Sequence, residues 1–155
     1  MASSKQVRQI LDEMSGQDAI MAIDNLLSPI FYSEPEKLSD EEKTIVYIEE
    51  LEREINNGGF NQFFYNSSGG YTEQIIDALR KIGSTKFLKI VENASAQFPN
   101  SLVPKDDTER QKLLEKIGSQ ANAVWNELDS EFFQYEEDIY SLMRNYIDKN
   151  VEKFR

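Results

Sequence analysis

Apolar residues recur every three or four positions along most of the chain, the spacing that places side chains on one face of an α-helix. The clearest such segment begins at Ser39, and its apolar stripe consists of Ile45, Ile48, Leu51 and Ile55. Ser39 and Glu42 have the spacing of a capping box, which favours a helix start. No run of alternating β-branched residues predicts a strand. The sequence therefore predicts an all-α fold, a single domain over residues 1–155 with about eight amphipathic helices.

Glycine, proline and capping side chains predict where these helices begin and end. The predicted boundaries are the end of the first helix at Gly16, a kink or end of the second at Pro29, a turn at Gly83 with Ser84 capping the next helix, a capping box at Thr108 and Gln111, an end at Gly118, and a last helix from about Glu136. A helix, a Gly-Ser turn and another helix in direct succession predict an antiparallel hairpin.

Residues 56–71 are the least generic stretch, because they contain four of the seven glycines in two pairs around a dense aromatic group. Asn57 and Gly58 are expected to end the helix that starts at Ser39. The helical spacing of Phe60, Phe63 and Phe64 favours core packing over ligand stacking. The asparagines Asn57, Asn61 and Asn66 are expected to cap helix ends rather than bind substrate. This uncharged segment therefore predicts a structural joint beside an acidic helix.

Composition excludes several classes of site. The chain has no histidine and no cysteine, which rules out a Ser-His-Asp triad, a cysteine nucleophile and a Cys/His zinc site. No phosphate-binding glycine loop and no calcium-loop pattern is present. We therefore expect no catalytic residue, no metal and no cofactor. No apolar run is long enough for a transmembrane helix, and the first residues lack a signal-peptide core, so the sequence predicts a cytoplasmic protein without membrane contact.

Negative charge is concentrated in two segments. Residues 34–54 contain nine acids and three bases, and residues 117–143 contain six acids and no base, so each segment carries a net charge of −6. The whole chain carries −11, which disfavours direct binding to nucleic acid and favours a basic partner. The bland interpretation is that these acids form a solvated surface that offsets helix dipoles and maintains solubility.

The sharper interpretation is a surface that resembles DNA, since carboxylates one helical turn apart are spaced about as closely as successive phosphates. A domain of this length spans roughly 40 Å, and duplex DNA of that length carries on the order of 23 charges. One chain has about half that charge, so mimicry requires both acidic segments on one face, or a homodimer. The candidate contacts are Glu41, Glu42, Glu49, Glu50, Glu54, Glu127, Asp129, Glu131, Glu136 and Glu137.

Residues 57–69 also resemble the signature sequence of a known family. In this chain the pattern consists of Asn57-Gly58-Gly59-Phe60, Gln62-Phe63-Phe64 and Asn66-Ser67-Ser68-Gly69. This pattern resembles the signature of a bacterial family of small all-helical proteins named for a DNA-mimic member, in which many members are uncharacterised. The similarity extends over roughly residues 43–147. It implies an acidic helical protein, often dimeric, that occupies the DNA-binding surface of a transcriptional regulator or nucleoid protein.

Two other functions remain open from the sequence. The glycine-bounded loop Asn66 to Gly70, beside Tyr65 and Tyr71, is a candidate small-molecule site or a carboxylate-based active site, which would require two facing carboxyl groups. An immunity-type inhibitor of a basic enzyme would share the acidic interface and differ only in its target. The DNA mimic is the leading hypothesis among the three.

Overall fold

The computed structural model describes residues 3–155, which form seven α-helices and four short 3₁₀ segments without any strand. The α-helices are α1 (Ser4–Glu13), α2 (Gly16–Ser33), α3 (Asp40–Tyr65), α4 (Thr72–Lys81), α5 (Lys86–Ser95), α6 (Asp107–Phe133) and α7 (Ile139–Lys149). The 3₁₀ segments are η1 (Pro35–Lys37), η2 (Ser67–Tyr71), η3 (Pro99–Ser101) and η4 (Val151–Lys153). The all-α prediction is confirmed, and the number of α-helices is corrected from eight to seven.

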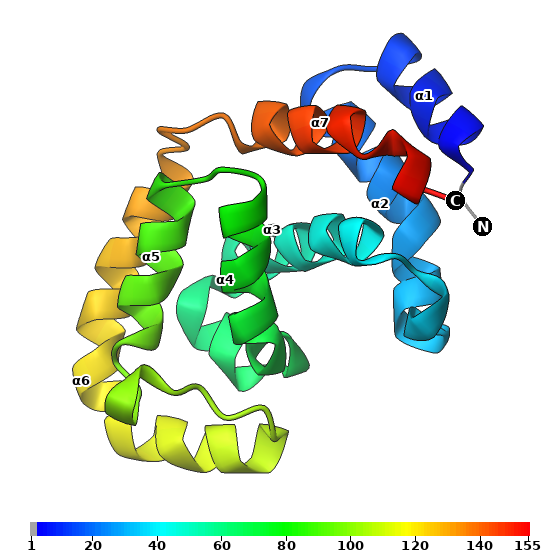
Figure 1. Ribbon diagram of the computed structural model, residues 1–155. Helices are drawn as coiled ribbons and strands as arrows, with labels where there is room; N and C mark the ends of the chain where they lie inside the picture. The colour runs from blue at the N-terminus through cyan, green and yellow to red at the C-terminus, as the bar shows by residue number, and fades with distance from the viewer. Residues whose placement is uncertain (1–2) are drawn as a thin grey trace.

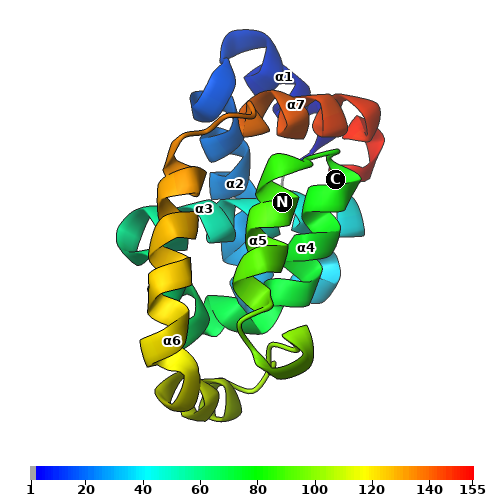
Figure 2. The same cartoon turned by 90° about the vertical axis from the view of Figure 1, so that its left-hand side faces the viewer.

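Helix α3 lies at the centre and contacts α2, α4 and α6 (Figure 1). The α4–α5 hairpin and α6 run alongside one another, whereas α1 and α7 lie together at one end of the molecule (Figure 2). The apolar stripe of α3 is fully buried at Ile45, Ile48, Leu51 and Ile55. This central position means that α3 is enclosed on several sides, which decides where its acidic side chains lie.

The predicted capping box at the start of α3 is confirmed. The Ser39 hydroxyl oxygen accepts a hydrogen bond from the backbone N–H of Glu42 at 3.1 Å, and Glu42 Oε1 accepts one from the backbone N–H of Ser39 at 2.9 Å. The helix path breaks at Gly59, which has a φ of 72° and a ψ of −172°. The predicted helix end at Asn57 and Gly58 is therefore close, but the chain resumes a helical turn directly after Gly59.

The predicted division of α6 is wrong. Residues 107–133 form one helix that continues through Gly118, so two predicted helices are one. The predicted capping box at Thr108 and Gln111 is also wrong, because the Asp106 side chain accepts the hydrogen bond from the backbone N–H of Glu109 at 2.9 Å. A glycine inside a helix costs only about 1 kcal/mol relative to alanine, and the packing of a 27-residue helix exceeds that cost.

Three further boundaries differ from the predictions. Helix α2 continues past Pro29 to Ser33, with the Ser33 hydroxyl donating to the Pro29 carbonyl oxygen at 2.8 Å. Ser84 does not cap α5, because its hydroxyl donates to Glu137 instead. The last helix begins at Ile139 rather than near Glu136, with the preceding aspartate as its N-cap. Local contacts therefore accompany the ends of α2 and α7, whereas a side chain distant in sequence caps α5.

The two ends of the described chain are joined. The Ser4 hydroxyl lies 2.8 Å from the Val151 carbonyl oxygen and 2.7 Å from that of Phe154. Among residues 3–155, no helix has both the length and the apolar content needed to cross a bilayer.

Candidate functional site

The kink in α3 is held by an acidic side chain of α6. Asp129 Oδ1 accepts a hydrogen bond from the backbone N–H of Phe60 at 2.8 Å. A Cβ atom added to Gly59 would lie 2.2 Å from Asp129 Oδ2, so only glycine fits both the positive φ and the approaching carboxylate. Burial raises the pKa of Asp129, and the Phe60 N–H opposes that rise. Asp129, a candidate partner contact, therefore serves the fold.

The aromatic residues of the signature segment form part of the core. Phe60, Phe63 and Phe64 are fully buried, as their helical spacing predicts. The Phe64 ring lies 4.9 Å from that of Phe98 and 5.2 Å from that of Trp125, measured between ring centroids. Contacts at these separations are typical of edge-to-face and tilted aromatic packing. None of these rings is available for stacking on a ligand.

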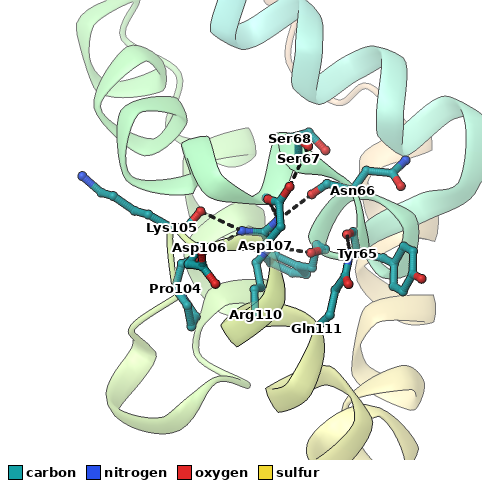
Figure 3. Close-up of polar contacts among 12 residues, drawn as sticks. Tyr65, Asn66, Ser67, Ser68, Pro104, Lys105, Asp106, Asp107, Arg110 and Gln111 are labelled. Carbon is teal, nitrogen blue, oxygen red and sulfur yellow. Dashed lines mark hydrogen bonds and ion pairs between the residues drawn. The ribbon is translucent and has the colours of Figure 1, made fainter.

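A fully buried arginine closes the loop that follows the aromatic turn (Figure 3). Arg110 Nε donates to the Phe64 carbonyl oxygen at 2.6 Å, and its Nη2 donates to the Asn66 carbonyl oxygen at 2.7 Å. Asp107 supplies the counter-charge, with its Oδ1 2.7 Å from Nη2. A Cβ atom added to Gly69 would lie 2.6 Å from Arg110 Nε. The second glycine pair therefore makes room for this guanidinium group.

The polar residues of the segment tie elements together. Gln62 Nε2 and Asn66 Nδ2 both donate to Glu54 Oε2, at 2.9 and 3.0 Å. Asn61 Nδ2 donates to Asn122 Oδ1 at 3.1 Å. Asn66 is the C-cap residue of α3, as expected, although its side-chain amide binds Glu54. Asn61 lies within α3, and its amide connects that helix to α6 instead of capping a helix end. The remaining signature residues, Asn57, Gly58, Ser67 and Ser68, lie at the same joint: Ser67 donates to Asp107 and Ser68 to the Phe63 carbonyl oxygen.

Two of the candidate partner contacts on α3 are buried and are not available to a partner. Glu42 is 1% exposed and Glu49 is 8% exposed. The first belongs to the capping box, and the second lies four residues after Ile45 on the apolar stripe. Glu50 accepts a hydrogen bond from the Tyr32 hydroxyl and Glu54 holds the signature amides, so both are half-buried. Glu41 is half-buried at the helix start.

The acids near the C-terminal end of α6 are more exposed to solvent than those of α3. Glu127 and Glu131 are exposed, one helical turn apart, and neither forms an ion pair with a described residue. Glu136 is exposed but lies 2.6 Å from Lys86 Nζ. Glu137 caps α5 by accepting hydrogen bonds from Ser84 Oγ at 2.6 Å and from the Thr85 backbone N–H at 3.2 Å. Burial alone would raise the pKa of Glu137, but these hydrogen bonds outweigh it and leave that pKa lowered.

Comparison with known families adds to this geometry. The model of the DMP19-like protein family matches residues 36–150, well over half of the chain. The chain belongs to the DMP19-like family. Neither the curated proteins nor the solved structures that were compared with it include a significant match. In this DMP19-like protein, the matched residues contain the signature segment and all ten candidate contacts, whereas α1 and α2 lie outside the match.

Sequence reasoning missed one group of polar residues in the DMP19-like chain. These residues lie together and come from α2, α3, the segment after α6 and the first turn of α7: Asp24, Glu52, Arg53, Tyr135 and Tyr140. A signal for Glu52 was present, because it lies four residues after Ile48 and three before Ile55, within the apolar stripe. Among the described residues, no group of three or more acidic side chains is arranged to hold a metal ion.

Proposed function

We propose that this protein is a DNA mimic that occupies the DNA-binding surface of a basic transcriptional regulator or nucleoid protein. The observation that carries the proposal is membership of the DMP19-like family, which is a family of DNA-mimic proteins. The net charge of −11 supports it, because a strongly acidic surface attracts the basic surface that a DNA-binding protein presents to phosphates.

The interface is centred on the C-terminal part of α6. Glu127 and Glu131 project from the same helix one turn apart, where Cβ atoms are about 5–6 Å apart. Glu136 continues the acidic surface past the helix end. Glu41 lies apart from this surface, because it is at the start of α3, about 27 Å along the helix from the kink that contacts Asp129. The other six candidate acids are buried, or bound within the chain. The proposed contact set is therefore smaller than the acidic segments of the sequence indicate.

Lysines of α5 border this surface. Lys86 and Lys89 line a cavity of about 470 Å³ together with Glu131 and Glu136. The Lys86–Glu136 pair is exposed on both sides, so it contributes little to stability and is readily exchanged for a partner's arginine or lysine. Because one chain has about half the charge of duplex DNA of the same length, the proposal includes a homodimer that presents two such surfaces.

Affinity capture with the immobilised protein tests the proposal. We expect the wild type to retain a DNA-binding protein that is released by added duplex DNA and by high salt. The matched control is the triple variant E127Q/E131Q/E136Q, which keeps side-chain size and removes three charges. Loss of capture by the triple variant supports the acidic interface. Capture that the triple variant retains in full, or that duplex DNA leaves unchanged, would contradict it.

A further inference from the structure

A cavity of about 550 Å³ lies between α2, α3, the segment after α6 and the first turn of α7. Its lining includes three carboxylates that are each more than nine-tenths buried, with Asp24 and Glu52 5% exposed and Glu49 8% exposed. Buried carboxylates are rare unless a cation or hydrogen-bond donors compensate them. Three buried carboxylates in the lining of one cavity are therefore unusual.

Each of these carboxylates has one oxygen without a hydrogen-bond partner among the described residues, namely Asp24 Oδ1, Glu49 Oε1 and Glu52 Oε1. The second oxygens of Asp24 and Glu52 face protein groups. Asp24 Oδ2 lies 3.3 Å from Arg53 Nη2, and Glu52 Oε2 accepts hydrogen bonds from the hydroxyls of Tyr135 at 2.8 Å and Tyr140 at 2.6 Å. Because buried polar atoms in proteins are nearly always hydrogen-bonded, these oxygens require donors beyond those of the hydrogen bonds described above. A proton on Glu49 provides one such donor, through the side-chain hydrogen bond between Glu49 and Glu52.

The protein's own cation does not fill that role. Arg53 is the one basic residue in the cavity lining among the described residues, and its side chain is 42% exposed. It also lies 3.8 Å from Glu50, so it is shared between two acids. Its contacts are with Asp24 and Glu50, and it forms no ion pair with Glu49 or Glu52, although its charge partly opposes the rise in the pKa of Glu49.

The pKa of Glu49 reflects this shortage of basic partners. Burial, together with the adjacent Glu52 carboxylate, raises the pKa of Glu49 to about 9. The charged or titratable groups facing it are Asp24 from α2, Glu52 and Arg53 from α3, and the two tyrosines. At neutral pH a proton on Glu49 therefore occupies the place that an external N–H donor would take.

The shape and lining of the cavity indicate which donor fits. The carboxylates are not arranged to hold a metal ion, so a ligand with several N–H groups spread in space suits them better than a point charge. The Tyr135 and Tyr140 rings stack with centroids 6.3 Å apart and an interplanar angle of 17°. Tyrosine rings favour organic cations, and the exposed apolar side chain of Met21 at the lining suits an aliphatic stem.

We propose that this cavity binds an organic cation, an alkylguanidinium or alkylammonium group, through Asp24, Glu49 and Glu52 beside the tyrosine pair. The group comes from a free small molecule or from an arginine or lysine side chain of another protein. On binding, the Glu49 carboxyl group passes its proton to solvent, and the resulting carboxylate accepts the N–H donors of the cation. The site does not depend on the proposed DNA mimicry, since its lining contains none of the exposed acids Glu127, Glu131 and Glu136.

Isothermal titration calorimetry of the full chain at about pH 7.5, in two buffers of different ionisation enthalpy, tests the proposal. The probes are butylguanidinium, butylammonium and a blocked Gly-Arg-Gly peptide. We expect butylguanidinium or butylammonium to bind with release of up to one proton. Equal binding by the peptide identifies a protein side chain as an accessible source, and binding of the small cations alone identifies a free molecule.

Two variants of the cavity and one control complete the test. The variant Glu49→Gln resembles the protonated side chain, so it should fold and should abolish proton release. The variant Asp24→Asn should weaken binding at least tenfold. Glu115→Gln, which changes an exposed acid of α6 outside the proposed interface, should leave affinity and proton release unchanged. The proposal is overturned if none of the probes binds at about 10 mM, far above the range of specific sites. It is equally overturned if binding is unaffected by both cavity variants.

Discussion

The backbone N–H of Phe60 donates to the carboxylate of Asp129, 69 residues later in the chain, at the point where α3 changes direction. The kink frees this N–H from the helix, and a buried donor without an acceptor would cost about 1–3 kcal/mol. Asp129 supplies the acceptor from α6. A glycine of the signature and an acid of the acidic segment therefore form one structural unit, which fixes α3 against α6.

Gly59→Ala should destabilise the protein by at least about 2 kcal/mol, since an L-residue at this φ and ψ is strained and its Cβ would overlap Asp129. Urea unfolding measures the loss. The matched control is Gly118→Ala, where an added Cβ meets nothing within 4 Å inside α6. That variant should gain about 0.5–1 kcal/mol. Equal effects at both positions would refute the assigned role of the kink.

Arg110→Met should lower the unfolding free energy by about 3 kcal/mol or more, because the carbonyl oxygens of Phe64 and Asn66 lose their buried donor. Thermal and urea unfolding both measure this change. Lys112→Ala, an exposed change on the same helix, should stay within about 0.5 kcal/mol of the wild type. An Arg110→Met variant as stable as the wild type would show that the closure of the loop does not depend on this guanidinium group.

Stability should fall as pH rises from about 7 to 9, and Glu49→Gln should remove most of that fall. The folded-state pKa of Glu49, about 9, exceeds its ordinary value of 4.5, so the folded state binds the proton more tightly than the unfolded state does. The loss therefore begins above the ordinary pKa of 4.5, continues between pH 7 and 9 and is complete above the folded-state pKa, with a slope of at most about 1.4 kcal/mol per pH unit.

Asp24, with a pKa of about 6, titrates mainly below this window. Unfolding free energies at several pH values, with Glu127→Gln as the control, measure the effect. A pH profile of Glu49→Gln that is identical to that of the wild type would contradict the assignment.

Lys86→Ala should strengthen binding to the captured partner, because it removes a base beside Glu136. Glu136→Gln should weaken binding by a comparable factor, since both changes alter the surface charge by one unit. The fold should tolerate both changes, as exposed ion pairs contribute about 0–1 kcal/mol. Titration at low and physiological salt measures the two affinities. Weaker binding of Lys86→Ala together with stronger binding of Glu136→Gln would place the interface elsewhere, and so would unchanged binding of both variants.

The sequence predicts the presence of helices far better than it predicts where one helix breaks and where it continues. Gly59 and Gly118 are both glycines inside apolar-periodic segments, yet only Gly59 has a positive φ. The difference lies in a tertiary contact, because Asp129 accepts the N–H that the kink frees, and no local pattern reveals that partner. The same reason explains Ser84, whose predicted capping role is taken over by Glu137 from a distant segment.

The acidic character of the candidate site could also be predicted, but its exposed residues could not. Glu49 and Glu127 are both helical acids next to apolar positions. Glu49 is buried because α2 and the segment leading to α7 cover that side of α3, whereas nothing described covers Glu127. A single sequence shows the charge of a helix face and not the neighbours that enclose it. The cavity lined by Asp24 and Glu52 depends on the same enclosure.

Mutual exclusion with DNA tests the central claim most directly. A labelled duplex is bound to the captured DNA-binding protein, and fluorescence anisotropy is followed as the wild-type protein or E127Q/E131Q/E136Q is added. A DNA mimic should release the duplex completely, at lower concentrations when salt is low, and the triple variant should release little. An anisotropy that stays high or rises with wild-type protein, which would indicate a ternary complex with the duplex still bound, would contradict the claim.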